Sequence, residues 1–330
     1  MPRPTQTPAI NKAFALDALA NHQIRLDGRK PLDQRPWSIN FYAQPEDDDE
    51  AGESAGDSGT ASAGLGKVDV RLGKTRVIAN ISASIVKPRE DRPYEGLIYI
   101  TSEMSGMTNQ SYIEGRTTED EVLTTRLIEK AIRKSEAVDR ESLCILAGEK
   151  VWAIRITLHY LSDDGNLLDC ACMAAMAALR HFKKEEVEVR GDEITVVSTS
   201  SAMSDDYLAR IEFSSCSLRF GNLQHKASER APMQLAIHHT PLCVTFAYLD
   251  DNNLILDPSH YESSIATGCL TLTLNAQREL CVLSKAGGTP LAKDELMRVV
   301  RLAVERVRDM TKALEDALKA DEKIRIIEVR

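Results

Sequence analysis

The chain has 330 residues, of which 43% are hydrophobic and 28% are charged, and its formal net charge is −9. This length allows a large buried core and two domains. The negative net charge argues against a protein that coats nucleic acid with its whole surface. Any contact with nucleic acid must therefore come from a local basic patch.

The seven cysteines are scattered without paired spacing and lie mostly in apolar runs. This pattern is typical of reduced thiols in a cytosolic or nuclear protein, and no zinc-type spacing occurs. The first residues lack an apolar signal core, and no apolar run approaches the ~18 residues of a membrane span. We therefore expect a soluble intracellular protein with no metal, no other cofactor and no membrane partner.

The first 22 residues are expected to form a proline-rich lead-in followed by a short amphipathic helix. The apolar residues that predict this helix are Ile10, Ala13, Phe14 and Ala20. After a turn at residues 26–31, alternation at Trp37, Ile39 and Phe41 predicts a strand, with which residues 67–72 could pair.

An acidic insert at residues 45–66 separates these two predicted strands. It is rich in Gly, Ser and Ala and has no large apolar side chain apart from one leucine near its end. Such a segment cannot compensate the entropy of ordering, so we expect a disordered loop. A solvated linker is favoured over a partner-binding segment, although composition leaves both open.

A basic loop at residues 87–93 lies between strands predicted at residues 76–85 and 96–101. It is bounded by prolines and carries Arg89 and Arg92.

A helix is predicted from Glu119 to about Lys134, with acidic residues in its first turn and basic residues in its last. Its core stripe is expected to contain Val122, Leu123, Ile128, Ala131 and Ile132. Arg126, Lys130 and Arg133 then share the other face at positions i, i+4 and i+7. The residues alone favour a solvated helix face over a binding surface.

Strands are predicted between residues 142 and 161, and a turn at residues 163–166 leads into an Ala- and Met-rich helix over 168–179. That helix is apolar almost all round, which predicts that neighbours cover every side. A second strand-rich unit follows, with strands at 235–237, 243–248, 254–256, 269–274 and 279–284. A long amphipathic helix after Pro290 completes it.

Strands followed by a helix, twice over, predict an α+β fold of two halves. We expect the first domain to span residues 23–198 and the second 199–330, with the boundary in a polar segment at 198–230 that holds a short β-like piece near 211–213.

Several motifs resemble ribonuclease PH-type proteins. They are RLDGR at 25–29, GKTRVIAN at 73–80, TRLIEKAIR at 125–133 and the Asp-Gly turn before the Ala-rich helix. Residues 144–155, CILAGEKVWAIR, and 237–246, IHHTPLCVTF, resemble ring subunits of the eukaryotic RNA exosome core. The resemblance covers about residues 20–315 and implies two fused halves of the ribosomal protein S5 domain 2-like type.

Active members of that family use inorganic phosphate to attack the 3′-terminal phosphodiester of RNA, which requires cations and acidic residues. Here the phosphate-binding Gly-Thr-Arg is matched by Gly165, Asn166 and Leu167, without a cation. The two acidic positions downstream of Leu256-Asp257 fall near Ser263 and near Thr267 or Cys269, and no acidic residue occurs from 263 to 277. The resemblance therefore implies no catalytic residues.

The resemblance reverses the interpretation of the basic helix face, because cations at corresponding positions of non-catalytic relatives contact RNA phosphates. It implies backbone contacts of low sequence preference, which few exposed aromatic residues also favour over base stacking. The residues implied are Arg126, Lys130, Arg116, Arg133, Arg89 and Arg92.

We therefore predict a non-catalytic ring subunit of the exosome core, in nucleus, nucleolus and cytoplasm, that scaffolds the complex for RNA processing and decay, including rRNA maturation. Its partners would be other ribonuclease PH-like ring subunits, cap subunits, associated nucleases and single-stranded RNA. An active phosphate-dependent 3′ exoribonuclease and a free-standing RNA-binding protein are the alternatives.

Overall fold

The computed structural model describes residues 9–42, 66–109, 112, 117–184, 186–190, 193–197, 233–250, 253–288 and 290–324. Four predictions fall outside these ranges. They concern the proline-rich lead-in at residues 1–8, nearly all of the acidic insert 45–66, the boundary segment with its β-like piece near 211–213, and the position of Arg116.

The first sheet is built around two long neighbouring strands, β3 and β6, and has the strand order β1-β2-β3-β6-β4, with β5 also paired to β6. Its strands are β1 (Trp37–Phe41), β2 (Lys67–Leu72), β3 (Thr75–Val86), β4 (Leu97–Met104), β5 (Cys144–Leu146) and β6 (Lys150–Ser162). The predicted pairing of the first two strands is confirmed and is antiparallel. Only β4 runs parallel to its neighbour in this sheet, so a long crossover through α2 separates it from β6.

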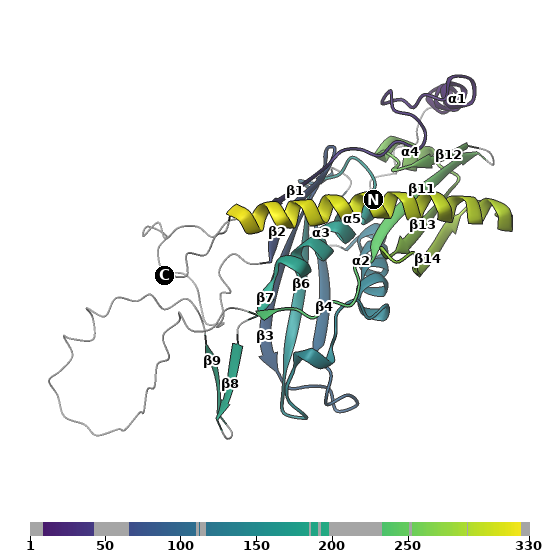
Figure 1. Cartoon of the computed structure of the whole chain (residues 1–330). Helices are drawn as coiled ribbons and strands as arrows, with labels where there is room; N and C mark the ends of the chain where they lie inside the picture. Colours follow the sequence, from purple (N-terminus) through teal and green to yellow (C-terminus); the bar gives the residue numbers. More distant parts are fainter. Residues whose placement is uncertain are drawn as a thin grey trace, which may run out of the picture.

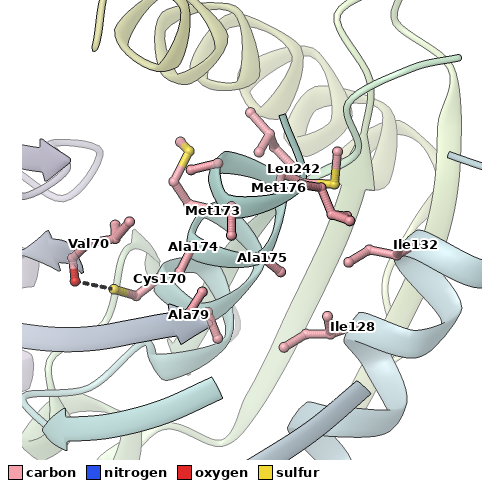
Figure 2. Close-up of a cluster of buried hydrophobic side chains, with 14 of the residues drawn as sticks. Val70, Ala79, Ile128, Ile132, Cys170, Met173, Ala174, Ala175, Met176 and Leu242 are labelled. Carbon is pink, nitrogen blue, oxygen red and sulfur yellow. Dashed lines mark hydrogen bonds between the residues drawn. The ribbon is translucent and has the colours of Figure 1, made fainter. Parts of the chain in front are cut away.

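Helix α3 (Leu167–His181) is the buried centre of the molecule, as the sequence predicts. Every residue from Cys170 to Leu179 is fully buried. Figure 2 shows Ile128 and Ile132 of the neighbouring helix directed toward this helix, and the Cys170 thiol donating to the Val70 carbonyl at 3.5 Å. Ala and Met suit such a position, because small side chains let the neighbours approach closely and Met fills the remaining gaps.

The second sheet is antiparallel, with the strand order β12-β11-β13-β14. Its strands are β11 (Leu242–Asp250), β12 (Asn253–Leu256), β13 (Gly268–Leu274) and β14 (Leu280–Gly287), and the short helix α4 (His260–Ile265) follows β12. Helix α5 (Lys293–Ile324) lies along the molecule over both sheets (Figure 1). Its predicted stripe is buried at Val299, Ala303, Val307, Met310 and Leu314. The two sheets, α3 and α5 share one hydrophobic core.

Smaller elements complete the chain. The hairpin of β8 (Glu186–Arg190) and β9 (Glu193–Val197) projects from the body, and β7 (Lys183–Lys184) pairs with β10 (Met233–Gln234). The strand predicted at 235–237 is wrong, because Ile237 forms only an isolated bridge with Val138. None of the helices in the described ranges combines the length and the hydropathy that a membrane crossing requires.

Two predicted core stripes require correction. The predicted N-terminal helix exists as α1 (Ala9–Asp17) and a π-helical turn, η1 (Ala18–His22), but Phe14 is 63% exposed. Its buried face carries Ala15 and Leu19 instead, because these side chains, four residues apart, pack on β11, β12 and α4.

In α2 (Glu119–Glu129) and its π-helical continuation η2 (Lys130–Lys134), Val122 and Leu123 are 46% and 60% exposed. The buried side runs through Glu121, Ile128 and Ile132, so positions 122 and 123 are turned about 100° and 200° away from it. The exposed face of α2 and η2 is therefore apolar at its start and basic at its end.

Candidate nucleic-acid interface

The basic helix face is fixed in position by a capping box at the start of α2. The Thr118 hydroxyl accepts from the Glu121 backbone N–H, and the Glu121 carboxylate accepts from the Thr118 N–H, each at 3.4 Å. Ile128 and Ile132 anchor the other side in the core. Arg126 and Lys130 are consequently held at the surface.

A groove of about 600 Å³ opens between η2, the loop after β3 and the start of β4. We call it the basic groove. Three of the predicted RNA-contacting residues line it, namely Arg89, Arg92 and Arg133. Arg126 and Lys130 lie on the same helix outside the groove lining, while Arg116 is in a segment that the structure does not describe.

The loop that forms one wall of the groove is held by backbone contacts. Arg89 and Arg92 form an isolated antiparallel bridge, and the Gly96 N–H donates to the Arg140 carbonyl at 2.9 Å. A Cβ on Gly96 would lie 2.4 Å from the Leu143 Cβ. The absence of a side chain at Gly96 thus lets the loop approach the sheet and brings its two arginines beside η2.

Carboxylates hold most of the guanidinium groups in and beside the groove. Glu129 accepts from Arg133 at 2.8 Å and from Arg126 at 3.0 Å, and Glu95 accepts from Arg140 at 2.8 Å and from Arg92 at 3.1 Å. These pairs are partly exposed and contribute little to stability, so an incoming phosphate can replace the carboxylates.

The groove lining nevertheless carries an excess of positive charge. Five cations face three carboxylates there, namely Arg89, Arg92, Arg133, Lys134, Arg140, Glu95, Glu129 and Glu136. Within the described part of the chain, Arg89 and Lys134 form no ion pair. The groove therefore offers both unpaired and exchangeable donors to an anion.

Sequence reasoning missed three residues of the groove, namely Tyr99, Lys134 and Arg140. Lys134 continues the basic pattern one turn after Lys130, and alternation along β4 could have indicated that Tyr99 faces outward. No sequence signal places Arg140, because it lies beyond the helix and is tied to the groove by contacts with Gly96, Glu95 and Glu136.

A second cluster of charged side chains lies buried between the two sheets, where active relatives are expected to perform catalysis. Arg35 donates to both Asp257 oxygens, through Nε at 2.9 Å and Nη2 at 2.8 Å. Asn166, at the start of α3, donates to Asp257 at 2.8 Å and to Asp169 at 2.8 Å. We call Arg35, Asn166, Asp169 and Asp257 the buried polar cluster.

Two arginines from the segment before β1 form ion pairs with acidic side chains that follow β12: Arg25 pairs with Glu262, and Arg35 pairs with Asp257. Burial alone would raise the pKa of Asp257, but the hydrogen bonds and charge of Arg35 hold this pKa below its ordinary value. Burial and the paired Arg25 guanidinium act on Glu262 in the same opposing way, and its pKa is also lowered. Both carboxylates are thus ionised structural partners.

Two observations bear on catalysis at this position. Gly165, Asn166 and Leu167 bring no cation to the start of α3. Among the described residues, no group of three or more His, Cys, Asp or Glu side chains could hold a metal ion.

Asp169 is fully buried and accepts three hydrogen bonds, from Asn166 and from the Thr245 backbone N–H and hydroxyl. Burial nevertheless raises its pKa to about 7, against the lowering effect of these hydrogen bonds. Between the ordinary value of 3.8 and about 7, the folded state therefore binds more protons than the unfolded state. The stabilising contribution of Asp169 is complete below the ordinary value and is lost as the pH rises through about 7.

We expect Asp169→Asn to remove this pH dependence. Between about pH 5 and pH 7.5, the free energy of unfolding of the wild type should fall by about 2–3 kcal/mol relative to the variant. Urea unfolding at both pH values measures the difference. His260 also has a raised pKa, but it is present in both proteins and cancels in the comparison. Parallel pH profiles for the two proteins would contradict the prediction.

Comparison with known proteins places both sheets in one family. The model described as "3' exoribonuclease family, domain 1" matches residues 52–185, and the model for domain 2 of the same family matches residues 239–306. Solved structures with a similar fold include the Archaeoglobus fulgidus exosome with RNA bound to the active site, with a TM-score of 0.67 and 23% identity over 92% of this chain and 97% of that chain. The predicted fold class is confirmed.

Curated relatives match along nearly the whole chain. Exosome complex component rrp45 of Schizosaccharomyces pombe is 34% identical over 97% of this chain and 94% of its own length. RRP45 of Saccharomyces cerevisiae is 35% identical over 97% of this chain and 94% of its own length. RRP45 of Homo sapiens is 34% identical over 97% of this chain, which spans 62% of the human protein.

Proposed function

Because this chain belongs to the 3′ exoribonuclease family through both of its domains, we propose that it is a non-catalytic ring subunit of an RNA exosome core. Relatives that match it along almost its whole length are named as exosome complex components. In this role it scaffolds the ring and helps line the channel that leads RNA 3′ ends to processing and decay, including rRNA maturation.

The observation that carries the non-catalytic assignment is the buried polar cluster. Phosphorolysis requires a cation for the attacking phosphate and carboxylates free to act on a metal ion or on the leaving group. Here Asn166 stands where a cation is required, and the two expected acidic positions fall near Ser263 and near Thr267 or Cys269. The neighbouring Asp257 is fully buried beneath Arg35 and Asn166. The chemistry of cleavage therefore has no suitable groups in this part of the described structure.

The basic groove and the adjoining helix face support the proposed contact with RNA. Their donors are cations on the chain surface, some of them held only by exchangeable carboxylates. Such donors bind backbone phosphates with low sequence preference and with strong salt dependence. Arg116 is proposed to join them on the basis of the family resemblance alone.

The proposed partners are other ribonuclease PH-like ring subunits, cap subunits, exosome-associated nucleases and single-stranded RNA. Nucleus, nucleolus and cytoplasm are the proposed locations. The domain limits, residues 23–198 and 199–330, also stay predictions.

Incubation of the purified chain with single-stranded RNA, magnesium and inorganic phosphate tests the non-catalytic assignment. We expect no release of nucleoside diphosphates, and their release would establish the alternative of an active phosphate-dependent exoribonuclease. Size-exclusion chromatography with candidate ring subunits tests assembly. A chain that remains monomeric with all of them would instead favour a free-standing RNA-binding protein.

We expect the double charge reversal Arg126→Glu with Lys130→Glu to weaken RNA binding about tenfold or more, without unfolding the subunit. Loss of two phosphate contacts should reduce the slope of log affinity against log salt by roughly 1.4. Fluorescence anisotropy with a single-stranded RNA over a salt series measures both effects, first with the full chain and then with the assembled ring.

A matched control for this variant is Arg301→Glu with Arg308→Glu on α5. Both arginines are exposed, the net charge change is identical, and neither residue lines the basic groove. Equal losses of affinity in the two double variants would assign the effect to net charge alone. An unchanged affinity in the Arg126 and Lys130 variant would refute the proposed contact.

A further inference from the structure

Tyr99 presents a large aromatic side chain on the exposed face of a strand. Along β4, Ile98, Ser102 and Met104 are buried, whereas Tyr99 is 40% exposed on the opposite face. β4 is an edge strand of the first sheet, and Tyr99 pairs in register with the exposed Arg155 of β6. The ring is therefore available to a ligand on the exposed face of this edge strand.

This ring lies in the lining of the basic groove. Among the described residues that line the groove, Tyr99 alone is aromatic, and its charged neighbours include Arg133 and Lys134 of η2 and Arg89 of the loop. The groove volume of about 600 Å³ falls within the range of sites that hold small organic molecules. An aromatic surface and several cations thus share one space.

The combination of an aromatic ring and several cations favours some anionic ligands over others. A phosphate chain without bases would use the cations and gain nothing from the ring, and an acidic peptide would also leave the ring unused. A nucleotide of a single strand uses both, because its base stacks on an aromatic side chain while its phosphates meet cations. Double-stranded RNA cannot do so, since its bases are already stacked and paired.

We propose that Tyr99 is a stacking platform for one unpaired base of a single-stranded RNA whose neighbouring phosphates contact Arg133 and Lys134. The proposal rests on the proposed function, because it assumes that RNA reaches the basic groove. It changes the expectation of pure backbone recognition: the groove binds single strands in preference to other polyanions. The preference is tolerant of sequence, because every base presents a flat face.

Binding of a short single-stranded RNA that contains 2-aminopurine tests the proposal with the full chain. Stacking on Tyr99 should quench the fluorescence of the base analogue on binding. We expect Tyr99→Leu to abolish the quenching and to lower the affinity about tenfold, while Tyr99→Phe retains both. The control is Tyr94→Leu, since Tyr94 is 65% exposed on the neighbouring loop but does not line the groove.

The double variant Arg133→Gln with Lys134→Gln, which removes two positive charges, separates this proposal from the proposed function. If that variant loses RNA affinity while Tyr99→Leu keeps both affinity and quenching, RNA binds the groove by its phosphates alone and the stacking proposal is wrong. If neither variant changes binding, RNA does not use the groove and both fail. Inorganic polyphosphate or poly-glutamate that competes as well as RNA of equal charge would also overturn the stacking proposal.

Discussion

Gly165→Ala will destabilise the fold by about 3–5 kcal/mol, because no side chain fits at the contact between the α3 turn and the α4 turn. Gly165 has φ +91°, and a Cβ there would lie 2.3 Å from the His260 nitrogen and 2.4 Å from the Ser259 carbonyl carbon. Both neighbouring atoms belong to the backbone at the start of α4, which follows β12. They cannot move away without breaking the bond from the His260 N–H to the Asp164 carbonyl.

Urea unfolding of the variant gives the loss, and Gly148→Ala is the matched control. Gly148 also has positive φ, +80°, but nothing lies within 4 Å of the position its Cβ would take. Its substitution should cost only about 1–2 kcal/mol of backbone strain. The difference between the two losses of unfolding free energy measures the contribution of the contact between the α3 turn and the α4 turn. Equal losses would mean that the α4 turn yields and that this contact does not hold the sheets together.

The sequence predicts the elements of this fold better than it predicts how their surfaces are used. Helix α3 was predictable because a segment apolar on all sides has one stable location, the core. The stripe of α5 was predictable because about five turns of regular spacing, from Leu296 to Leu314, admit only one buried face. The turn before α3 was predictable from its Asp and Gly residues. These features are properties of single segments.

The buried faces of two short helices, α1 and α2, were mispredicted, because contacts with other parts of the fold decide which face is buried. Val122 and Leu123 were expected in the core, yet Glu121 is buried there instead, because the capping box turns its carboxylate back to the backbone. The rotation of the helix is set by Ile128, Ala131 and Ile132, which are fully buried, and Val122 and Leu123 lie away from that face. Phe14 was misplaced in the same way, since the surface of the second unit, which sequence does not reveal, selects the face of α1.

In the candidate site, sequence predicted only those residues that follow from the pattern of a single segment. Arg133 follows from helix periodicity and Arg89 from its basic loop, but their meeting in one groove depends on Gly96 approaching Leu143. Tyr99 was missed because the small number of aromatic residues argued against base stacking, and composition does not locate the aromatic residues that are present. The pairing of Arg35 with Asp257 joins positions 222 residues apart, and no local pattern indicates it.

We expect Arg35→Met to destabilise the protein by about 3–5 kcal/mol at neutral pH, because it removes the guanidinium that pairs with both oxygens of the buried Asp257 carboxylate and leaves the more distant Arg29 to balance the charge. The Arg35 side chain also donates to the Thr75 hydroxyl at 3.2 Å and to the Gly165 carbonyl at 3.0 Å. One guanidinium therefore connects the first sheet, the α3 turn and the second unit. Methionine keeps an unbranched apolar side chain like the stem of arginine and removes every one of these donors.

The double variant Arg35→Met with Asp257→Asn distinguishes an unpaired charge from lost packing. If the buried charge dominates, the second substitution should recover about 1–3 kcal/mol of the first loss, since a neutral amide needs no counter-ion. The recovered energy is the coupling between the two positions and comes from urea unfolding of all four proteins. An additive loss would show that Arg35 acts through Thr75 and Gly165 instead.

The pH dependence of stability gives a second test, because the pKa of Asp257 should be shifted in opposite directions in the wild type and in Arg35→Met. In the wild type the pKa of Asp257 is lowered, so its stabilising contribution is present above the ordinary value of 3.8 and is lost as the pH falls through the folded pKa. In Arg35→Met the burial of Asp257 is no longer opposed by Arg35, and its pKa should rise above the ordinary value. The stability deficit of the variant should therefore shrink as the pH falls from about 7 to about 5. A deficit that stays constant over this range would mean that another donor, such as Arg29 at 3.2 Å, has taken over the charge of Asp257.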